Sequence, residues 1–403
     1  MICHATAYQE HKIKVETTMQ NFTYYSPTRI HFGQGQIAKL RSEIGKNERI
    51  LLTYGGGRIK RNGILDQVHA ALPGYQIHEF GGIEPNPSYE TLMKAVAYAR
   101  YHGITHLLAV GGGSVVDGTK FIAAAIPYQG EPWEIVTSRG QAIEKALPLS
   151  CVLTLPATGS ETNCFSVISK KQTMDKQSFA SPHVYPHCAI LDPTATFSLP
   201  PRQTANGVVD AFIHILEQYL TYPVNALVQD EYAEGLLRIL IEEGPKALTS
   251  PQDYDIRANI MWTASQALNG ILGVGVPQDW ATHALGHEIT ALHGLDHAQT
   301  LAIVLPALLN EKRQEKYAKL IQYAQKVWGI HQGSDAFKID SAINETRKFF
   351  ERMGLKTRLS DFNISEADIP ALVQKLQQHG QTALGEHQDI TLEVSQRIYM
   401  AAL

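Results

Sequence analysis

The sequence predicts two domains, an α/β domain built on a parallel sheet and an all-helical domain after it. From about residue 28 to residue 195, short apolar runs alternate with glycine-rich turns and helical segments, which is the pattern of parallel strands joined by crossover helices. After Pro200 and Pro201, long helical periodicities take over and β-branched runs become rare. We therefore place the α/β domain at residues 19–200 and the helical domain at residues 201–403, each of ordinary domain size.

The first 18 residues fit neither domain. They mix histidines, lysines and glutamates without a clear period, so we predict a loose extension at 1–18. We also hypothesise that Met19 is the native start of the chain.

Two apolar runs in the α/β domain are predicted strands that end in glycines. Residues 49–54 lead into the triplet 55–57, and residues 105–110 lead into Gly111, Gly112, Gly113 and Ser114. Open α/β sheets bind ligands beyond the carboxyl ends of their strands, where backbone amides and helix N-termini hold phosphate. The two junctions therefore predict a nucleotide site in a Rossmann-like domain.

The helical domain contains several segments with helical periodicity. The predicted helices cover residues 208–220, 230–242, 256–268, 278–292, 314–327 and 340–353. Since the candidate metal ligands lie in this half and the glycine turns in the other, we expect the active site in the cleft between the domains.

Composition excludes several classes of protein. Hydrophobic residues make up 44% of the 403 residues and charged residues 18%, which is typical of a soluble globular protein, and the net charge of −4 does not favour binding to nucleic acid or an anionic membrane. We find no membrane-length apolar run and no signal peptide core. The four cysteines have no C-x-x-C spacing and are too sparse to crosslink the chain, so we expect a cytoplasmic protein: Cys3, Cys151, Cys164 and Cys188.

Carboxylate and imidazole side chains in the second half predict a site for a divalent transition metal. Asp210 and His214 are four residues apart in an apolar helical run, so both leave one helix face. Four histidines then fall within the fifteen residues 283–297, and His283 and His297 complete a candidate set. Three imidazoles and one carboxylate leave room for a substrate oxygen, as Lewis-acid catalysis requires.

Two structural alternatives compete with the metal site. The pair 210 and 214, together with Glu217, could be the solvated stripe of an amphipathic helix, and the later histidines could be capping or surface residues. A zinc-protease helix starting at His287 is excluded because position 291 is alanine.

The glycine turn at 111–117 is suited to approach a pyrophosphate closely, with Ser114 and the following helix N-terminus as donors. It is neither a G-x-G-x-x-G fingerprint nor a Walker sequence with its lysine, which disfavours ATP or GTP hydrolysis. The alternative is a plain strand-to-helix turn. In the loop 153–161, Thr154 and Thr158 are candidate contacts for a nicotinamide or its ribose.

The choice between NAD(H) and NADP(H) depends on charge near the adenosine ribose. After the first glycine triplet come Arg58, Lys60 and Arg61 with no acid nearby, which favours NADP(H). The alternative is that these cations form an ordinary solvated face.

Together these motifs resemble the iron-containing, or group III, alcohol dehydrogenase family, in particular its NADPH-dependent aldehyde reductases and butanol dehydrogenases. The resemblance runs from residue 19 onward and depends on GGGSVVD at 111–117, TLPATGSE at 154–161, D-x-x-x-H at 210–214, and H-x-x-x-H at 283–287 followed by His297. It implies a dehydroquinate synthase-like architecture and a homodimer. It also implies one divalent metal ion, Fe²⁺ or Zn²⁺, held by Asp210, His214, His283 and His297.

The resemblance further assigns His287 to the nicotinamide rather than the metal, as the catalytic residue. It implies these cofactor contacts: Gly56, Arg58, Gly112, Gly113, Ser114, Asp117, Thr154, Thr158, Asn163 and Lys176. Arg58 is a departure, since a close relative has serine there.

The expected reaction is hydride transfer between NADP(H) and a small aldehyde or primary alcohol, with the metal as Lewis acid. The proton would come from solvent or through His287, which we expect to titrate near the working pH. Trp262, Trp280, Phe165 and Leu272 are candidate pocket residues. One alternative is an NAD- and metal-dependent lyase of the dehydroquinate synthase type, and another is a non-catalytic nucleotide-binding or metal-storage protein.

Overall fold

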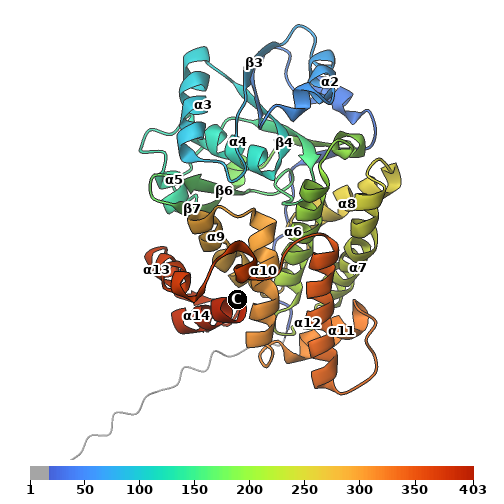
Figure 1. The fold of residues 1–403 in the computed structure, drawn as a ribbon. Coiled ribbons are helices and arrows are strands. Elements are labelled where there is room, and N and C mark those ends of the chain that lie inside the picture. The colour runs from blue at the N-terminus through green and yellow to red at the C-terminus, as the bar shows by residue number, and fades with distance from the viewer. Residues whose placement is uncertain (1–17) are drawn as a thin grey trace, which may run out of the picture.

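The computed structural model describes residues 18–403, so the predicted extension lies outside the described residues except for its last position. The first half of the described chain forms a sheet with helices against it, and the second half forms a group of helices packed below the sheet (Figure 1). The first helix of the second half begins at Pro201, where proline suits the first helical position because its N–H would have no partner there.

A six-stranded parallel sheet forms the centre of the first half, with the strand order β1-β8-β5-β4-β2-β3. The strands are β1 (Arg29–Phe32), β2 (Arg49–Tyr54), β3 (Gln76–Phe80), β4 (His106–Gly112), β5 (Leu149–Leu155) and β8 (Cys188–Leu191). The run predicted at 49–54 is β2. The run predicted at 105–110 is β4, which extends two residues into the glycines.

Helices cover both faces of this sheet, as the apolar strands predict. Leu51 faces the layer that contains α3 (Tyr89–His102) and α4 (Gly113–Ala125), whereas Ile50 and Leu52 face the layer that contains α1 (Leu40–Glu43) and α2 (Ile64–Ala71). The short helix α5 (Glu134–Thr137) completes the helices of this half.

An antiparallel hairpin follows β5 and lies outside the main sheet. It consists of β6 (Phe165–Lys170) and β7 (Asp175–Ala180). The hairpin packs on α4 through β6 and on helix α9 (Ala281–His293) of the second half through β7, so it belongs to the contact between the halves (Figure 1).

The second half is largely helical, as predicted, but contains one small two-stranded sheet, β9 (Ala383–Leu384) with β10 (Ile390–Thr391). The prediction of a helical second half is confirmed, and this pair of two-residue strands is a small addition to it. The helices are α6 (Pro201–Tyr219), α7 (Leu227–Thr249), α8 (Tyr254–Ala267), α9 (Ala281–His293), α10 (His297–Glu311), α11 (Tyr317–Lys326), α12 (Asp335–Arg352), α13 (Ile369–Gln378) and α14 (Leu392–Ala401).

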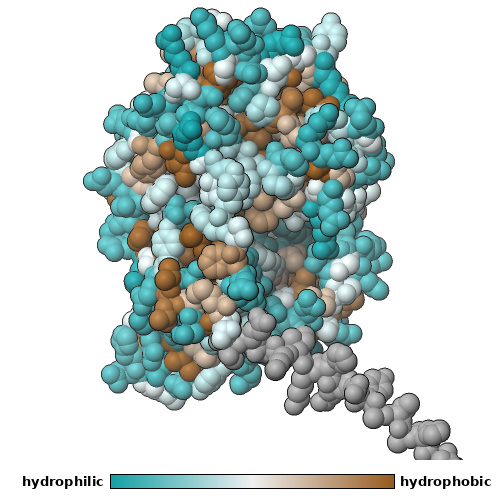
Figure 2. All heavy atoms as spheres, turned by 180° about the vertical axis from the view of Figure 1, so that it is seen from behind, coloured by the Kyte–Doolittle hydropathy of each residue, from teal (hydrophilic) through white to brown (hydrophobic). Residues whose placement is uncertain are grey.

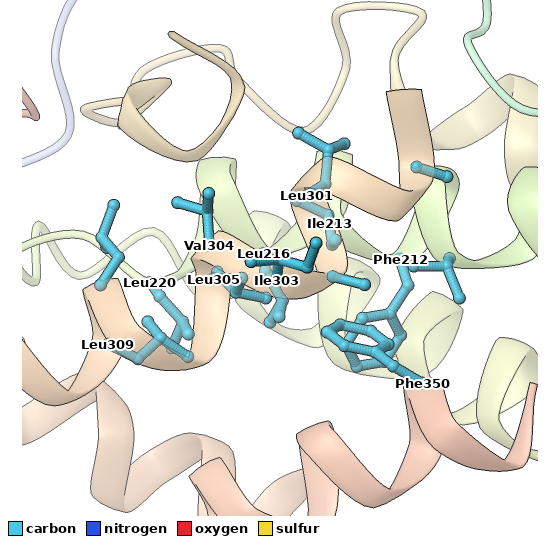
Figure 3. Close-up of a cluster of buried hydrophobic side chains, with 14 of the residues drawn as sticks. Phe212, Ile213, Leu216, Leu220, Leu301, Ile303, Val304, Leu305, Leu309 and Phe350 are labelled. Carbon is cyan, nitrogen blue, oxygen red and sulfur yellow. The ribbon is translucent and has the colours of Figure 1, made fainter. Parts of the chain in front are cut away.

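Helix α6 lies at the centre of this half and is buried along most of its length. Its apolar side chains meet those of α10, and Phe212 makes an edge-on contact with Phe350 of α12 at a ring-centroid distance of 5.8 Å (Figure 3). The interpretation of Asp210, His214 and Glu217 as a solvated stripe is therefore wrong, because all three side chains are buried.

Hydrophilic side chains cover most of the back of the molecule, and apolar ones lie there in separate groups (Figure 2). No helix within residues 18–403 combines the length and apolar character that crossing a membrane would need.

Candidate active site

Four side chains from three helices of the second half come together, with three imidazoles converging on one carboxylate oxygen. Asp210 and His214 come from α6, His283 from α9, and His297 is the first residue of α10. The Nε2 atoms of His214, His283 and His297 lie 3.6, 3.9 and 3.7 Å from Oδ1 of Asp210. The ligand atoms of Asp210, His283 and His297 also all lie within 4.8 Å of one another, which makes these three the most compact part of the set.

These distances suit a metal better than hydrogen bonds. They exceed ordinary N–H···O lengths, whereas bonds of about 2.1 Å to a tetrahedral ion place neighbouring ligand atoms about 3.4 Å apart. Oδ1 of Asp210 and Nε2 of His283 are buried and have no hydrogen-bond partner within residues 18–403. A divalent cation would satisfy both atoms, so the donor set fits the metal that the sequence predicts.

The protonation of two of the three ligand histidines also fits a metal, whereas in the third, His283, burial is overcome by Glu217 and Asp210, which raise its pKa to about 9. Burial lowers the pKa of His214 to about 4, and burial followed by the charge of Lys176 lowers the pKa of His297 well below its ordinary value. Both imidazoles are therefore neutral at neutral pH, which is the ligating form.

Glu217 orients His283, a role that the sequence analysis missed. Its Oε2 contacts Nδ1 of His283, and its Oε1 accepts from the backbone amides of Thr282 and His283 at 2.7 and 3.3 Å. Metal-binding histidines commonly donate their second nitrogen to such a carboxylate. Glu217 lies seven residues after Asp210, on the same helix face, and this spacing could have indicated the role.

His287 lies one turn after His283 on α9, and its ring is next to that of His297, with centroids 5.3 Å apart. Burial, Lys176 and His283 lower the pKa of His287 well below its ordinary value. The expectation that His287 titrates near the working pH is therefore wrong, because its imidazole is neutral there.

Lys176 reaches from β7 into the metal-binding set. Its Nζ lies 3.3 Å from Nδ1 of His297, and the side chain is buried. Burial lowers the pKa of Lys176 to about 8, and the nearby charges of Asp210 and Asp117 oppose that change. Lys176 therefore lies between α4, which carries Asp117, and the metal-binding helices.

The predicted cofactor residues gather at the carboxyl ends of three adjacent strands. Gly56 and Arg58 follow β2, Gly113 and Ser114 follow β4, and Thr158 follows β5, with the remaining predicted contacts on the same segments and on β7: Gly112, Asp117, Thr154, Asn163 and Lys176. This is the edge at which an open parallel sheet binds nucleotides.

The second glycine turn is packed tightly against the loop after β5. A Cβ on Gly113 would lie 2.5 Å from Oγ1 of Thr158, and a Cβ on Gly112 would lie 2.9 Å from Cβ of Leu155. Glycine is therefore required here for close packing, which brings Ser114 and the N-terminus of α4 next to Thr158.

The polar atoms of Asp117 are bonded within the first half, and Asn163 also bonds to the second half. Asp117 accepts from Oγ of Ser160 at 2.6 Å and from the backbone N of Val167 at 2.9 Å. Asn163 accepts from Nζ of Lys120 at 3.0 Å and donates to the carbonyl of Leu268 at 3.0 Å. These bonds fix α4, the loop after β5 and the hairpin relative to one another.

The cations after β2 differ in their surroundings. Arg58 is exposed and donates from Nη1 to the carbonyl of Ser198 at 2.6 Å. Lys60 pairs with Glu79 at 3.0 Å, and Glu79 comes from the end of β3. The sequence has no acid close to these cations along the chain, but the fold brings Glu79 to Lys60 and neutralises part of the cluster.

Among the candidate pocket residues, Trp280 lies at the metal-binding set, with its ring 5.5 Å from that of His283. Trp262 instead packs against Phe32 at 5.7 Å. Phe165 is half exposed and Leu272 is buried.

The fold and the site together are those of a metal-dependent dehydrogenase. The nucleotide-binding edge of a parallel sheet faces a candidate metal site made of one carboxylate and three histidines. Two family models agree with this class. "Iron-containing alcohol dehydrogenase" matches residues 27–193, and "Fe-containing alcohol dehydrogenase family, C-terminal" matches residues 204–403. The chain belongs to the iron-containing alcohol dehydrogenase family.

Individual relatives cover almost the whole chain. It is 62% identical to the NADPH-dependent aldehyde reductase YqhD of Escherichia coli, over 95% of this chain and 100% of that protein. It is 40% identical to the probable NADH-dependent butanol dehydrogenase 1 of Bacillus subtilis, over 96% and 100%. The crystal structure of Escherichia coli YqhD superposes with a TM-score of 0.95 at 61% identity, covering 96% of this chain and 100% of that one.

These relatives make the chain an oxidoreductase, and they do not favour the lyase alternative. The predicted fold class is confirmed, because family structures share the parallel sheet and the largely helical second half.

Proposed function

We propose that the chain is a metal-dependent aldehyde reductase that transfers hydride between NADP(H) and a small aldehyde or primary alcohol. The observation that carries the proposal is the convergence of three imidazole nitrogens on the unpaired Oδ1 of Asp210, in a chain 62% identical to an NADPH-dependent aldehyde reductase.

Asp210, His214, His283 and His297 would hold one divalent ion, Fe²⁺ or Zn²⁺. When bound, the ion supplies a Lewis acid that withdraws electrons from a carbonyl oxygen and stabilises the alkoxide product. The ligand set determines the net charge of the site and its free coordination positions. One carboxylate and three neutral imidazoles leave one net positive charge and room for a further ligand.

NADP(H) would bind along the edge formed by β2, β4 and β5. The amides of Gly112 and Gly113, the hydroxyl of Ser114 and the N-terminus of α4 would hold the pyrophosphate. Thr154 and Thr158 would contact the nicotinamide or its ribose. Asp117 and Asn163 would act by holding this segment in place, because Asp117 already accepts from Ser160 and Asn163 already bonds to Lys120 and to the carbonyl of Leu268 in the second half.

The first turn would select NADP(H). Gly56 and the exposed guanidinium of Arg58 would lie beside the adenosine ribose, and Arg58 would provide the cation for the 2′-phosphate. Lys60 contributes less in this proposal because Glu79 already pairs with it.

His287 would lie beside the nicotinamide and relay a proton. Its Nε2 is buried and lacks a hydrogen-bond partner in the part of the chain that the structure describes. A neutral imidazole can relay a proton by releasing the one on its first ring nitrogen while its second takes one up, with solvent as the source. Lys176 would hold His297 from the other domain.

We further propose a homodimer that works in the cytoplasm. Exposed aromatic residues before and on β1, at the edge of the sheet, support an assembly through this region: Phe22, Tyr25 and Phe32. Cys151, Cys164 and Cys188 are free, which suits a reducing compartment. Analytical ultracentrifugation tests the dimer.

The decisive experiment measures NADPH oxidation with a panel of short and medium aldehydes, using apo-protein reconstituted with iron, zinc or manganese in turn. We expect net NADPH consumption that requires metal, and a loss of several orders of magnitude in rate in His283→Ala. Metal binding without turnover of any aldehyde would overturn the proposal and favour a storage role. A retained rate in His283→Ala with full metal content would overturn the ligand assignment.

A further inference from the structure

One histidine far from the metal ligands in sequence connects the two halves of the site. His379 follows the last residue of α13, and both of its ring nitrogens face carboxylates. Nδ1 lies 2.7 Å from Oε1 of Glu288 on α9, and Nε2 lies 3.0 Å from Oδ1 of Asp175 on β7. The three residues form a continuous bridge from the second half to the hairpin of the first.

Each end of this bridge is adjacent to a residue of the proposed active site. Glu288 directly follows His287 on α9, and Asp175 directly precedes Lys176 on β7. Lys176 in turn reaches Nδ1 of His297 at 3.3 Å. The bridge therefore lies beside the contact between Lys176 and His297. On β7 it is one residue from Lys176, and on α9 it is one residue from His287.

The chemistry of the bridge requires a charged histidine. A neutral imidazole can donate from only one nitrogen, so one of the two carboxylates would face a lone pair. An imidazolium donates to both, and charge-assisted bonds are about twice as strong as neutral ones. The groups that face His379 from the packed elements are Glu288 on α9 and Asp175 on β7, while Lys375 on α13 approaches Asp175 at 3.1 Å.

The two carboxylates depend on His379 to different degrees. Asp175 also accepts from Lys375 and from Oγ1 of Thr173 at 2.6 Å. Glu288 is buried, and its Oε2 has no partner in residues 18–403. Within those residues, His379 is the side chain that donates a hydrogen bond to the carboxylate of Glu288. Without His379, a buried carboxylate next to His287 would lose that donor, and α9 would have to shift or the carboxylate take up a proton.

We propose that His379 is a positioning residue, which holds β7 against α9 and thereby sets the distance of Lys176 from His297 and of His287 from the cofactor edge. The inference rests on the proposed function, because the positions of His287 and Lys176 affect the rate only if both residues belong to the active site. His379 acts through Glu288 and Asp175 and touches neither metal ligand nor cofactor edge in this arrangement.

Three variants test the bridge. His379→Gln removes the charge and one of the two bonds, and Asp175→Asn weakens only the end at β7 while keeping the shape of the side chain. Lys375→Met is the matched control, because it removes another cation from Asp175 and leaves the link to α9 intact. Circular dichroism first establishes that each variant is folded. If His379→Gln does not fold, Asp175→Asn still tests the bridge.

Two readouts do not depend on aldehyde turnover. Amide hydrogen exchange without cofactor should become faster over residues 165–180 in His379→Gln and Asp175→Asn. The visible absorption of the Co²⁺-loaded protein, which reports the surroundings of His297, should change in the same two variants. In Lys375→Met the Co²⁺ spectrum should stay as in the wild type, and exchange should change only near residue 173, because Nζ of Lys375 donates to the carbonyl of Thr173 at 2.8 Å.

The kinetic readout separates positioning from simple stabilisation. Since a displacement of about 1 Å can cost about a hundredfold in rate, we expect kcat to fall about tenfold or more while KM for NADPH stays within about twofold. Unchanged kcat, exchange and Co²⁺ spectrum in folded His379→Gln would overturn the inference. A wild type that binds Co²⁺ but reduces no aldehyde would instead overturn the proposed function, and the exchange data would still decide whether the bridge holds β7.

Discussion

Oε2 of Glu217 contacts Nδ1 of His283, and this contact directs Nε2 of the same ring toward Asp210. The pair is buried in the second half. Burial opposes a charged His283, but Glu217 and Asp210 raise the pKa of His283 above its ordinary value. The proton on Nδ1 stays with Glu217, and a metal at Nε2 would displace the proton that the raised pKa places there, so Glu217 supports the ligand set from outside it.

We therefore predict that Glu217→Ala weakens metal binding by about ten- to a hundredfold, because an outer carboxylate of this type orients its histidine and raises its basicity. Competition with a coloured chelator measures the affinity. Glu242→Ala, at an exposed position on α7, is the control and should bind metal as the wild type does. Equal affinities in the two variants would contradict the orienting role.

Gly56→Asp should shift cofactor preference from NADPH toward NADH. No atom lies within 4 Å of a Cβ built on Gly56, so the side chain fits without a clash, and its carboxylate would repel a 2′-phosphate and accept from a 2′-hydroxyl. The measurement is kcat/KM with each cofactor. Gly56→Asn has the same shape without the charge and should shift the ratio far less. If both variants keep the wild-type ratio, the ribose lies elsewhere.

Arg58→Ser should lower kcat/KM for NADPH by about ten- to a hundredfold, as expected for the loss of a charge-assisted hydrogen bond, and should leave NADH almost unaffected. Lys60→Ser should have a smaller effect, since Glu79 already neutralises Lys60. Initial rates with both cofactors give the ranking, and a larger loss in Lys60→Ser would reverse our assignment of the phosphate cation.

Stability should depend on pH through His379. Its bond to Glu288, aided by Asp175, raises the pKa of His379 above the ordinary value of 6.5. A raised pKa stabilises the fold fully below that ordinary value, and the contribution is lost as the pH rises through the folded pKa. The gap in melting temperature between wild type and His379→Gln should be widest at about pH 6 and narrow toward about pH 9. His331→Gln, at an exposed position, should show no such trend, and a gap independent of pH would mean that His379 is neutral.

The sequence predicted the elements whose pattern is local. The strand at 49–54 has six residues bounded by glycine on one side, and β2 has those bounds. Helix α10 was missed, although it carries His297. It is apolar on nearly every side and contains Pro306, so it shows neither an amphipathic period nor an uninterrupted helical pattern. Packing against α9, α6, α14 and α12 accounts for such a helix.

In the candidate site too, local spacing predicted some residues, and others depend on the tertiary fold. Asp210 and His214 were predictable because four residues along a helix place two side chains together. Glu79 lies 19 positions after Lys60, and His379 lies 204 positions after Asp175, so neither contact follows from spacing. Those pairs depend on strand order and on the placement of the hairpin, which only the tertiary fold determines.

All four proposed ligands come from α6, α9 and α10, within one half of the chain, and among the site residues that the structure describes Lys176 reaches them from the other half. Opening of the crevice for cofactor exchange would therefore leave coordination intact and change mainly the neighbour of His297. The contact between Lys176 and His297 would then differ between the open and the closed enzyme, while the ion would stay bound in both.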